Sequence, residues 1–452
     1  MVLGNDGLLG DILLRVDSPT TLVHAALVSK RWFHCASYPF FLRRFSEIHP
    51  QPRLLGAYVT GDGLLRPEFV SVPSTQPTDL VGIAHRANLG FGANLTPYAS
   101  TIWDVRDGRV LYESAEAFHL PRTAAMRAPL LYPGRDLTML PLPPPVMPGC
   151  PHVVLLIPDA GDGAVCYRID VGVWDHVVFS KVHILRVDGE GEGEWSLHCS
   201  VVEQIDTQPV RFLEMMVLAG GKVYMVAAVG YVLGLDLTTA RFFVVELPDG
   251  VMCEFDGSNV LVCRGRDDHD TLCLVHVEGD TLNVWIHKIN GQVSEWVLKD
   301  TMSMQETCAN FLPKEEESAP EQQADNDMPH GEVGLEEPED NDAPEEEVGS
   351  ESEEVDRPPD EVVPPEEPAE GGGANTYYVV GAGDNAEFVF LELGTSGVIV
   401  YVHLGTKKVE KVYQRDPDDD NIIRVYPFMM VRPLTFPMLP GGEAEEEEEY
   451  AS

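Results

Sequence analysis

Paired cysteines are missing from this sequence. Its 452 residues contain 8 cysteines, and none of them forms a C-x-x-C pair or lies beside histidines at zinc-finger spacing. Scattered cysteines fit a reducing compartment, where a thiol behaves as a small buried hydrophobic group. We therefore expect neither a structural metal site nor a disulfide framework.

Long apolar runs are also missing. No run approaches the 18 or so apolar residues that a membrane-spanning helix needs. The opening stretch "MVLGNDGLLGDILLRV" is too short and too acidic for a signal peptide. We expect a cytoplasmic and/or nuclear protein with no membrane partner.

Basic residues are scarce, with 31 Lys and Arg against 74 Asp and Glu and a net charge of -43. This balance argues against a general affinity for nucleic acid or anionic membranes. The charge is uneven, because residues 314–370 hold 24 acidic and 2 basic side chains, and the tail "EAEEEEE" (443–449) holds 6 more acids. The rest of the chain carries -15, which is ordinary for a soluble acidic protein.

Catalytic and ligand-binding motifs are lacking as well. There is no H-E-x-x-H and no G-x-S-x-G. "GAGDNA" (381–386) matches G-x-G-x-x-A, but the alternating segment "EFVFLEL" follows instead of a helix, so a β-turn is favoured over a dinucleotide site. "DPDDDN" (416–421) lacks the glycine and glutamate of a calcium loop. We expect no cofactor, no metal and no enzymatic activity, because the sequence contains no catalytic motif that would support an enzyme.

Aromatic and histidine side chains on the expected strands are interpreted as packing residues. Four tryptophans are expected in the core rather than in a ligand cage: Trp103, Trp174, Trp285 and Trp296. Five histidines are expected to pack between strands or to face solvent: His183, His198, His269, His276 and His287.

The first 50 residues predict short helices. In "GLLGDILLRV" the apolar residues Leu8, Leu9, Ile12, Leu13 and Val16 recur at helical spacing. Ser18-Pro19 then predicts the start of a second helix, and "SKRWFHCAS" a third, with Pro39 as punctuation. Three short helices with this much apolar surface are marginal alone, so they need a partner.

From about Arg53 onward, short strands alternate with turn signals. "STIWDVRDGRVLYES" predicts a hairpin around Asp107-Gly108. Groups of three or four strands then recur at roughly 45 residues, which predicts a β-propeller of about six blades. The pattern also allows a pair of β-sandwiches.

The acidic segment interrupts this strand array. Its few apolar residues cannot offset the entropy of ordering, so it is expected to be a disordered loop between strands or blades, with strands resuming at Tyr377. The expected organisation is an α+β multidomain chain. Its parts are a three-helix unit (1–50), a propeller-like domain (51–312), a disordered acidic insert (313–373), the last propeller strands (374–440) and a disordered acidic tail (441–452).

Two regions together resemble a known family. Residues 8–50, "LLGDILLRVDSPTTLVHAALVSKRWFHCASYPFFLRRFSEIHP", resemble the F-box in the form found in plants, especially grasses. Stretches such as "GGKVYMVAAVGYVLGLDLTTARFFVVELPDG" and "PFMMVRPLTFPML" resemble the propeller-like domain that follows it there. The chain departs from the family at Leu3-Gly4, where Leu-Pro is usual, at Ser29, where Cys is usual, and at the helix glycines Gly7 and Gly10.

This resemblance implies a role in protein ubiquitination. The F-box would dock on the Skp-type adaptor of an SCF-type cullin–RING ubiquitin ligase, and the propeller would bind an unknown target protein. The residues expected to bind the adaptor are Leu8, Leu9, Ile12, Leu13, Leu22, Val28, Lys30, Arg31 and Trp32, with Leu27 packed inside the helical unit. The alternative is a protein-binding scaffold outside any ligase, with a degenerate F-box.

Overall fold

The structure is a computed structural model of the chain. It describes residues 6–16, 19–49, 54–61, 67–72, 100–115, 122–127, 137–145, 150, 152–158, 164–174, 176–187, 193–205, 212–227, 230–254, 258–265, 271–290, 293–312, 376–394, 396–415 and 423–429. The predicted disorder of the acidic insert and tail, the "DPDDDN" turn and His269 lie outside these residues.

In the described residues 6–16 and 19–49 the N-terminal unit has four helices, not three: α1 (Asp6–Leu13), α2 (Pro19–Ala26), α3 (Lys30–Ser37) and α4 (Pro39–Ile48). The fourth helix begins at Pro39, where the sequence predicted only a break after the third helix. Tyr38 is extended and Pro39 opens α4. A proline cannot continue α3, because it lacks the N–H group, but it is well suited to the first turn of a new helix.

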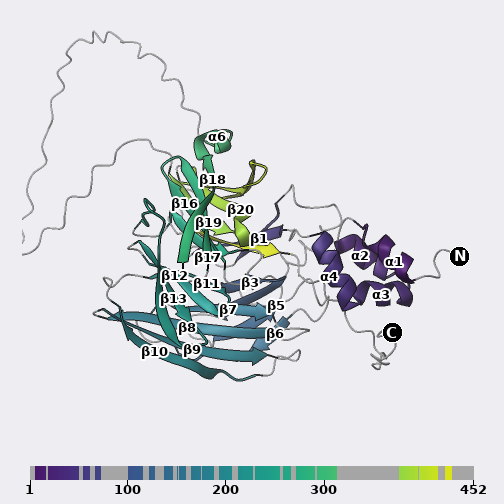
Figure 1. Ribbon diagram of the computed structural model, residues 1–452, viewed down its shortest axis with the longest axis horizontal. Helices are drawn as coiled ribbons and strands as arrows, with labels where there is room; N and C mark the ends of the chain where they lie inside the picture. Colours follow the sequence, from purple (N-terminus) through teal and green to yellow (C-terminus); the bar gives the residue numbers. More distant parts are fainter. Residues whose placement is uncertain are drawn as a thin grey trace, which may run out of the picture. The chain divides into compact units, whose positions relative to one another are not determined.

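The β region consists of six antiparallel sheets, which we call blades 1 to 6 (Figure 1). Blade 1 joins β2 (Glu68–Val70), β1 (Leu54–Gly61) and β23 (Ile423–Met429). Blade 2 contains β3 (Ser100–Arg106), β4 (Arg109–Ala115), β5 (Arg122–Arg127) and β6 (Leu137–Leu140); blade 3 contains β7 (His152–Pro158), β8 (Ala164–Trp174), β9 (Val177–Val187) and β10 (Ser196–Gln204). Blade 4 contains β11 (Phe212–Ala219), β12 (Lys222–Ala227), β13 (Tyr231–Asp236) and β14 (Arg241–Glu246); blade 5 contains β15 (Val260–Arg264), β16 (Leu272–Glu278), β17 (Thr281–Asn290) and β18 (Val293–Ser303). Blade 6 contains β19 (Tyr377–Ala382), β20 (Phe388–Leu393), β21 (Val398–His403) and β22 (Lys408–Gln414).

Two turns behave as the sequence predicted. Asp107 and Gly108, between β3 and β4, have φ of 46° and 71°. Two central residues with positive φ are typical of a type I′ hairpin turn. The "GAGDNA" stretch ends β19, passes through a short 3₁₀ turn (Asp384–Ala386) and enters β20, so a strand follows it rather than the helix that a dinucleotide site requires.

The six blades form a closed ring. The inner strands β23, β3, β7, β11, β15 and β19 contact one another in that order, and β19 contacts β23 again. A buried apolar cluster fills each of the six seams between neighbouring blades. The prediction of a six-bladed propeller is confirmed, and the alternative of two sandwiches is wrong.

Blade 1 closes the ring with strands from both ends of the β region. β1 pairs with β23 from Leu54 opposite Met429 to Gly61 opposite Ile423. Tyr58, Phe69 and Phe428 pack edge to face there, with ring centroids 5.0 to 5.8 Å apart. The phenylalanine at the centre of this cluster, Phe428, is fully buried. Edge-to-face pairs add stabilisation beyond the apolar area that they bury.

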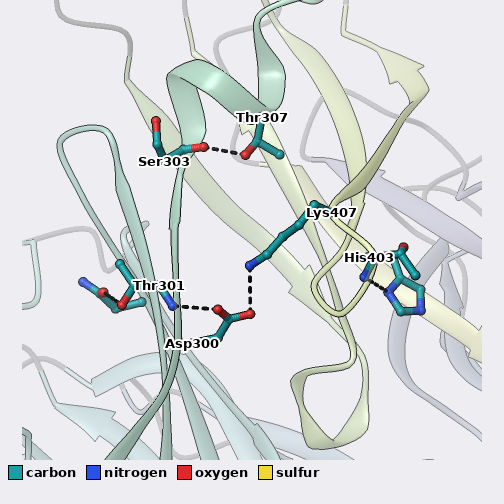
Figure 2. A network of polar contacts seen from close by, with 8 residues as sticks. Asp300, Thr301, Ser303, Thr307, His403 and Lys407 are labelled. Carbon is teal, nitrogen blue, oxygen red and sulfur yellow. Dashed lines mark hydrogen bonds and ion pairs between the residues drawn. The ribbon is translucent and has the colours of Figure 1, made fainter.

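The acidic segment begins and ends at the seam between blades 5 and 6. After β18 the chain forms the short helix α6 (Met304–Cys308), and it re-enters the ring at β19, which begins at Tyr377 as the strand pattern predicted. Side chains bridge the same seam. The Lys407 ammonium lies 2.9 Å from the Asp300 carboxylate (Figure 2), and Arg264 lies 2.7 Å from Asp384. The apolar cluster and these bridges hold the two blades together across the insertion.

Ring closure leads to a stability prediction. Phe428→Ala should destabilise the chain by about 3–5 kcal/mol, because it leaves a cavity within the aromatic cluster. The measurement is the shift of the urea unfolding midpoint. Val202→Ala, at an exposed position, is the control and should change stability by less than about 0.5 kcal/mol. A Phe428→Ala shift as small as the control would contradict the role of this cluster.

Candidate protein-interaction site

The helical unit has an apolar core of its own. Leu9, Leu13 and Leu22 are fully buried in it, beside Ala36 and Phe45. The sequence had assigned the three leucines to the adaptor-binding surface, and the structure contradicts that assignment. They cannot contact a partner directly, because the four helices bury them against one another.

A second apolar stripe of α1 faces outward. Leu8 and Ile12 lie one turn apart on the same side of the helix, and each is 39% exposed. The turn between α2 and α3 adds Val28, which is 66% exposed. Leu27 was expected inside the unit but is 74% exposed, since α2 ends at Ala26 and Leu27 lies in the turn.

Polar contacts fix α3 beside this stripe. The Ser29 hydroxyl accepts a hydrogen bond from the Trp32 backbone N–H at 3.3 Å and thereby caps the helix. The Arg31 guanidinium donates to the Asp6 carboxylate of α1 at 2.6 Å, which brings the first turns of α1 and α3 together. Lys30 is exposed, and Trp32 is half-buried with its ring against the helical core.

Six of the nine predicted adaptor residues therefore lie at least partly on the surface: Leu8, Ile12, Val28, Lys30, Arg31 and Trp32. We call Leu8, Ile12, Val28 and Trp32 the helical patch. An apolar patch with a cationic rim is typical of a protein-binding surface. The helical patch is the part of the described helical unit where apolar side chains lie together at the surface. Desolvation and the Asp6 carboxylate raise the pKa of the nearby Cys35 thiol, which makes it a poor nucleophile.

Gly10 occupies the middle of α1 without a packing reason. A Cβ atom placed there would lie 3.8 Å from the Cys35 Sγ, an ordinary van der Waals distance. The glycine therefore weakens α1 through its conformational freedom and does not serve a close approach.

The aromatic and histidine side chains of the ring mostly pack in its seams, as predicted. Trp285 and Trp296 are half-buried between blades 4 and 5, and Trp103 between blades 2 and 3. His276 and His287 are buried, and desolvation lowers the pKa of each ring, so both stay neutral at pH 7. The core assignment of Trp174 is wrong, because its side chain is 77% exposed at the tip of the β8–β9 hairpin.

Charged side chains gather where the inner strands β3 and β15 end. Arg106 lies 3.8 Å from Asp104 in blade 2, and the Arg264–Asp384 pair joins blades 5 and 6. Burial raises the pKa of Asp107, against the opposing effect of Arg264 and Arg106. Each arginine has an aspartate beside it, so the cluster acts as a polar link between blades. No three or more His, Cys, Asp or Glu side chains of the described ranges are placed to hold a metal ion.

The ring matches a known family. Residues 101–333 and 362–436, more than half of the chain, match the family described as F-box protein AT5G49610-like, beta-propeller. The chain belongs to this family. The match to the AT5G49610-like propeller starts at residue 101, so it does not include α1–α4. It also omits residues 334–361, which lie within the acidic segment.

The other comparisons found no matching curated protein and only weak likenesses to solved structures. Similar solved structures include BBS1N in complex with ARL6DN (12% identity, 46% of this chain and 54% of that one, TM-score 0.24). Another is the nidogen/laminin complex, with 9% identity, 73% of this chain and 99% of that one covered, and a TM-score of 0.26. A third is the NanB sialidase from Streptococcus pneumoniae, with 12% identity, 56% of this chain and 44% of that one covered, and a TM-score of 0.26. The chain spans about half the length of the first and third of these. Among the described helices, none is long and apolar enough to cross a membrane.

The geometry at Gly10 leads to a second prediction. Gly10→Ala should stabilise α1 by about 0.5–1 kcal/mol and slow amide hydrogen exchange in residues 6–13 about two- to fivefold. Gly172→Ala in β8 is a control of opposite sign, since its Cβ would stand 2.1 Å from the Phe179 ring and destabilise blade 3. Faster exchange in α1 of the Gly10→Ala chain would contradict the packing described for α1 and α3.

Proposed function

We propose that this chain is the substrate-recognition subunit of an SCF-type cullin–RING ubiquitin ligase. In this proposal the helical patch docks on a Skp-type adaptor, and the propeller binds the target protein. Membership in a family of F-box-protein propellers is the observation that carries the proposal. The outward stripe of Leu8 and Ile12, next to Val28, supports it from the physical side, because apolar side chains that an isolated unit leaves in water favour association.

The roles of the N-terminal residues follow from their burial. Leu9, Leu13 and Leu22 would hold the helical unit together, and the helical patch would supply the dry centre of the interface. Lys30 and Arg31 would lie at its rim, where charges steer the encounter with an acidic partner more than they add affinity. Arg31 would also keep α1 and α3 in place through Asp6.

The proposed subunit has no chemistry of its own. It would act by holding a target close to the charged ubiquitin carrier, which turns an encounter between two molecules into a reaction within one complex. We place this activity in the cytoplasm and/or the nucleus, where such a ligase would meet reduced, soluble targets.

The proposal predicts that a surface variant loses the adaptor while the chain stays folded. Ile12→Asp combined with Val28→Asp should weaken binding of a purified Skp-type adaptor at least about thirtyfold, since two charges would be desolvated in an apolar interface. The measurement is the dissociation constant from biolayer interferometry. Circular dichroism of the same sample should show unchanged helix content, because both positions are exposed.

Ile48→Asp is the matched control for this variant. Ile48 is an exposed apolar residue at the end of α4, outside the helical patch, and its substitution should leave adaptor affinity within about twofold. If the unmodified chain binds no Skp-type adaptor, or if the double variant binds as well as the control, the ligase role is wrong. The first of these outcomes would favour the scaffold with a degenerate F-box.

A further inference from the structure

The outer strands of the blades differ in how they protect their free edges. Two are very short, β2 with 3 residues and β6 with 4. β14 carries a charge at each end, and β18 and β22 each carry three or more charged side chains. β10 has 9 residues, "SLHCSVVEQ", with Glu203 as its one charged side chain and no proline. Short length, charge, proline and β-bulges are the usual means by which sheets prevent added pairing. β10 is not short and has no proline. Its one charge is Glu203, and its one bulge lies between Leu197 and Cys199, so that the segment from Cys199 to Gln204 pairs regularly with β9.

The outer edge of β10 is unpaired in the part of the chain that the structure describes. β10 is the terminal strand of blade 3, and its only ladder is with β9 (Figure 1). The Glu203 carboxylate accepts a hydrogen bond from the Phe242 backbone N–H at 3.0 Å and is therefore turned toward blade 4. The single charged side chain of β10 therefore does not lie where it would prevent another strand from pairing with the outer edge.

Apolar side chains form a row on one face beside this edge. Val202 lies opposite Phe179 on β9, and Phe179 opposite Gly172 on β8, so these positions share a face. Trp174 lies two residues beyond Gly172 and joins the same face. Val202 is 72% exposed, and Leu197, opposite His183 on that face, is 59% exposed. We call Trp174, Phe179, Leu197 and Val202 the blade-3 row.

One cation interrupts the row. Lys181 is exposed on β9, opposite the small side chain of Ser200 on β10. Its other neighbour in the sheet, Asp170, is buried and bonded to Arg168 at 3.0 Å. Strands lie about 4.8 Å apart, so a strand added beyond β10 would be about 9.6 Å from β9. The Lys181 side chain and a glutamate side chain of the added strand together can span that distance, because the side chain of Ser200 between them is small.

We propose that the edge of β10 captures an extended segment of a target protein as an added β-strand. The segment would place an apolar side chain against Val202 and, two residues away, a carboxylate over Ser200 toward Lys181. Main-chain hydrogen bonds would supply the affinity, and these two side-chain positions the selectivity. The inference rests on the proposed function only in identifying the segment as part of a ligase target.

Charge favours a peptide over a second copy of this chain as the occupant. Each copy carries a net charge of -43, so two copies repel each other. Two β10 strands would also bring no carboxylate of their own to Lys181, because Glu203 is bonded toward blade 4. A short segment with a single glutamate meets little of that repulsion and supplies the missing charge.

The test uses the full chain and two synthetic peptides of roughly nine residues, the length of β10. Both alternate valine with threonine, with a central glutamate in one and a central lysine in the other. Because the valine–threonine alternation is symmetric about the central residue, each peptide can pair with β10 in a parallel or an antiparallel direction. Fluorescence anisotropy of labelled peptide gives the dissociation constants, and quenching of tryptophan emission by iodide reports shielding of Trp174.

The expected result is saturable binding of the glutamate peptide with reduced iodide quenching. Val202→Lys should raise its dissociation constant at least about tenfold, and Lys181→Glu should reverse the preference between the two peptides. Val244→Lys is the matched control, an exposed valine on the outer strand β14, and should leave binding within about twofold.

Four outcomes would overturn the inference. The first three are the absence of saturable binding, equal weakening by Val244→Lys, and a peptide preference that does not follow the charge at position 181. A dimer in sedimentation equilibrium that Val202→Lys dissociates would assign the edge to a second copy and would also overturn it. The Ile12→Asp/Val28→Asp chain should still bind the glutamate peptide, so a failure of adaptor docking and a failure of strand capture are distinguishable.

Discussion

The β ring depends on the pairing of β1 with β23. These strands come from opposite ends of the β region, and their ladder turns a row of five consecutive sheets into a closed circle. The Tyr58, Phe69 and Phe428 cluster adds side-chain packing at that place. Each remaining blade is built from neighbouring hairpins, so its pairing is local. The closing ladder is the one long-range strand pairing that the described topology requires, and the six apolar seams become continuous only after it forms.

A closed ring of local blades explains why the chain accepts so long an acidic insertion. The entropy of closing a loop grows slowly, by about 0.6 kcal/mol for each doubling of its length. Residues 313–375 leave the ring at the end of blade 5 and return at the start of blade 6, where no strand pairing is interrupted. The seam itself is held by buried apolar side chains, with Lys407 and Asp300 bridging it at the surface. The helical unit has a separate core, so variants on the helical patch should leave the ring unaffected.

The sequence predicted features that depend on local chemistry. The Asp107-Gly108 turn, the strand groups and the number of blades follow from alternation and turn residues, and all are confirmed. Burial within the helices was harder to predict. Leu8 and Ile12 form one stripe of α1, and Leu9 and Leu13 form the next, and both have helical spacing. Only the position of α3 and α4 decides that the second stripe faces inward. Trp174 shows the same limit, because strand alternation does not reveal that β8 extends past β7.

The exposed edge of β10 and the large negative charge of the chain are physically compatible. An edge strand with a single charged side chain and apolar neighbours invites self-pairing, which is a hazard for any protein at high concentration. Acidic side chains elsewhere in the chain oppose that hazard, since repulsion between two highly charged copies acts before their edges meet. At physiological salt the Debye length is about 8 Å, so a target strand already seated on β10 would interact with Lys181 and hardly with distant carboxylates. Repulsion between two acidic copies would oppose self-pairing, most strongly at low salt, while a short-range contact at one lysine would select an acidic strand.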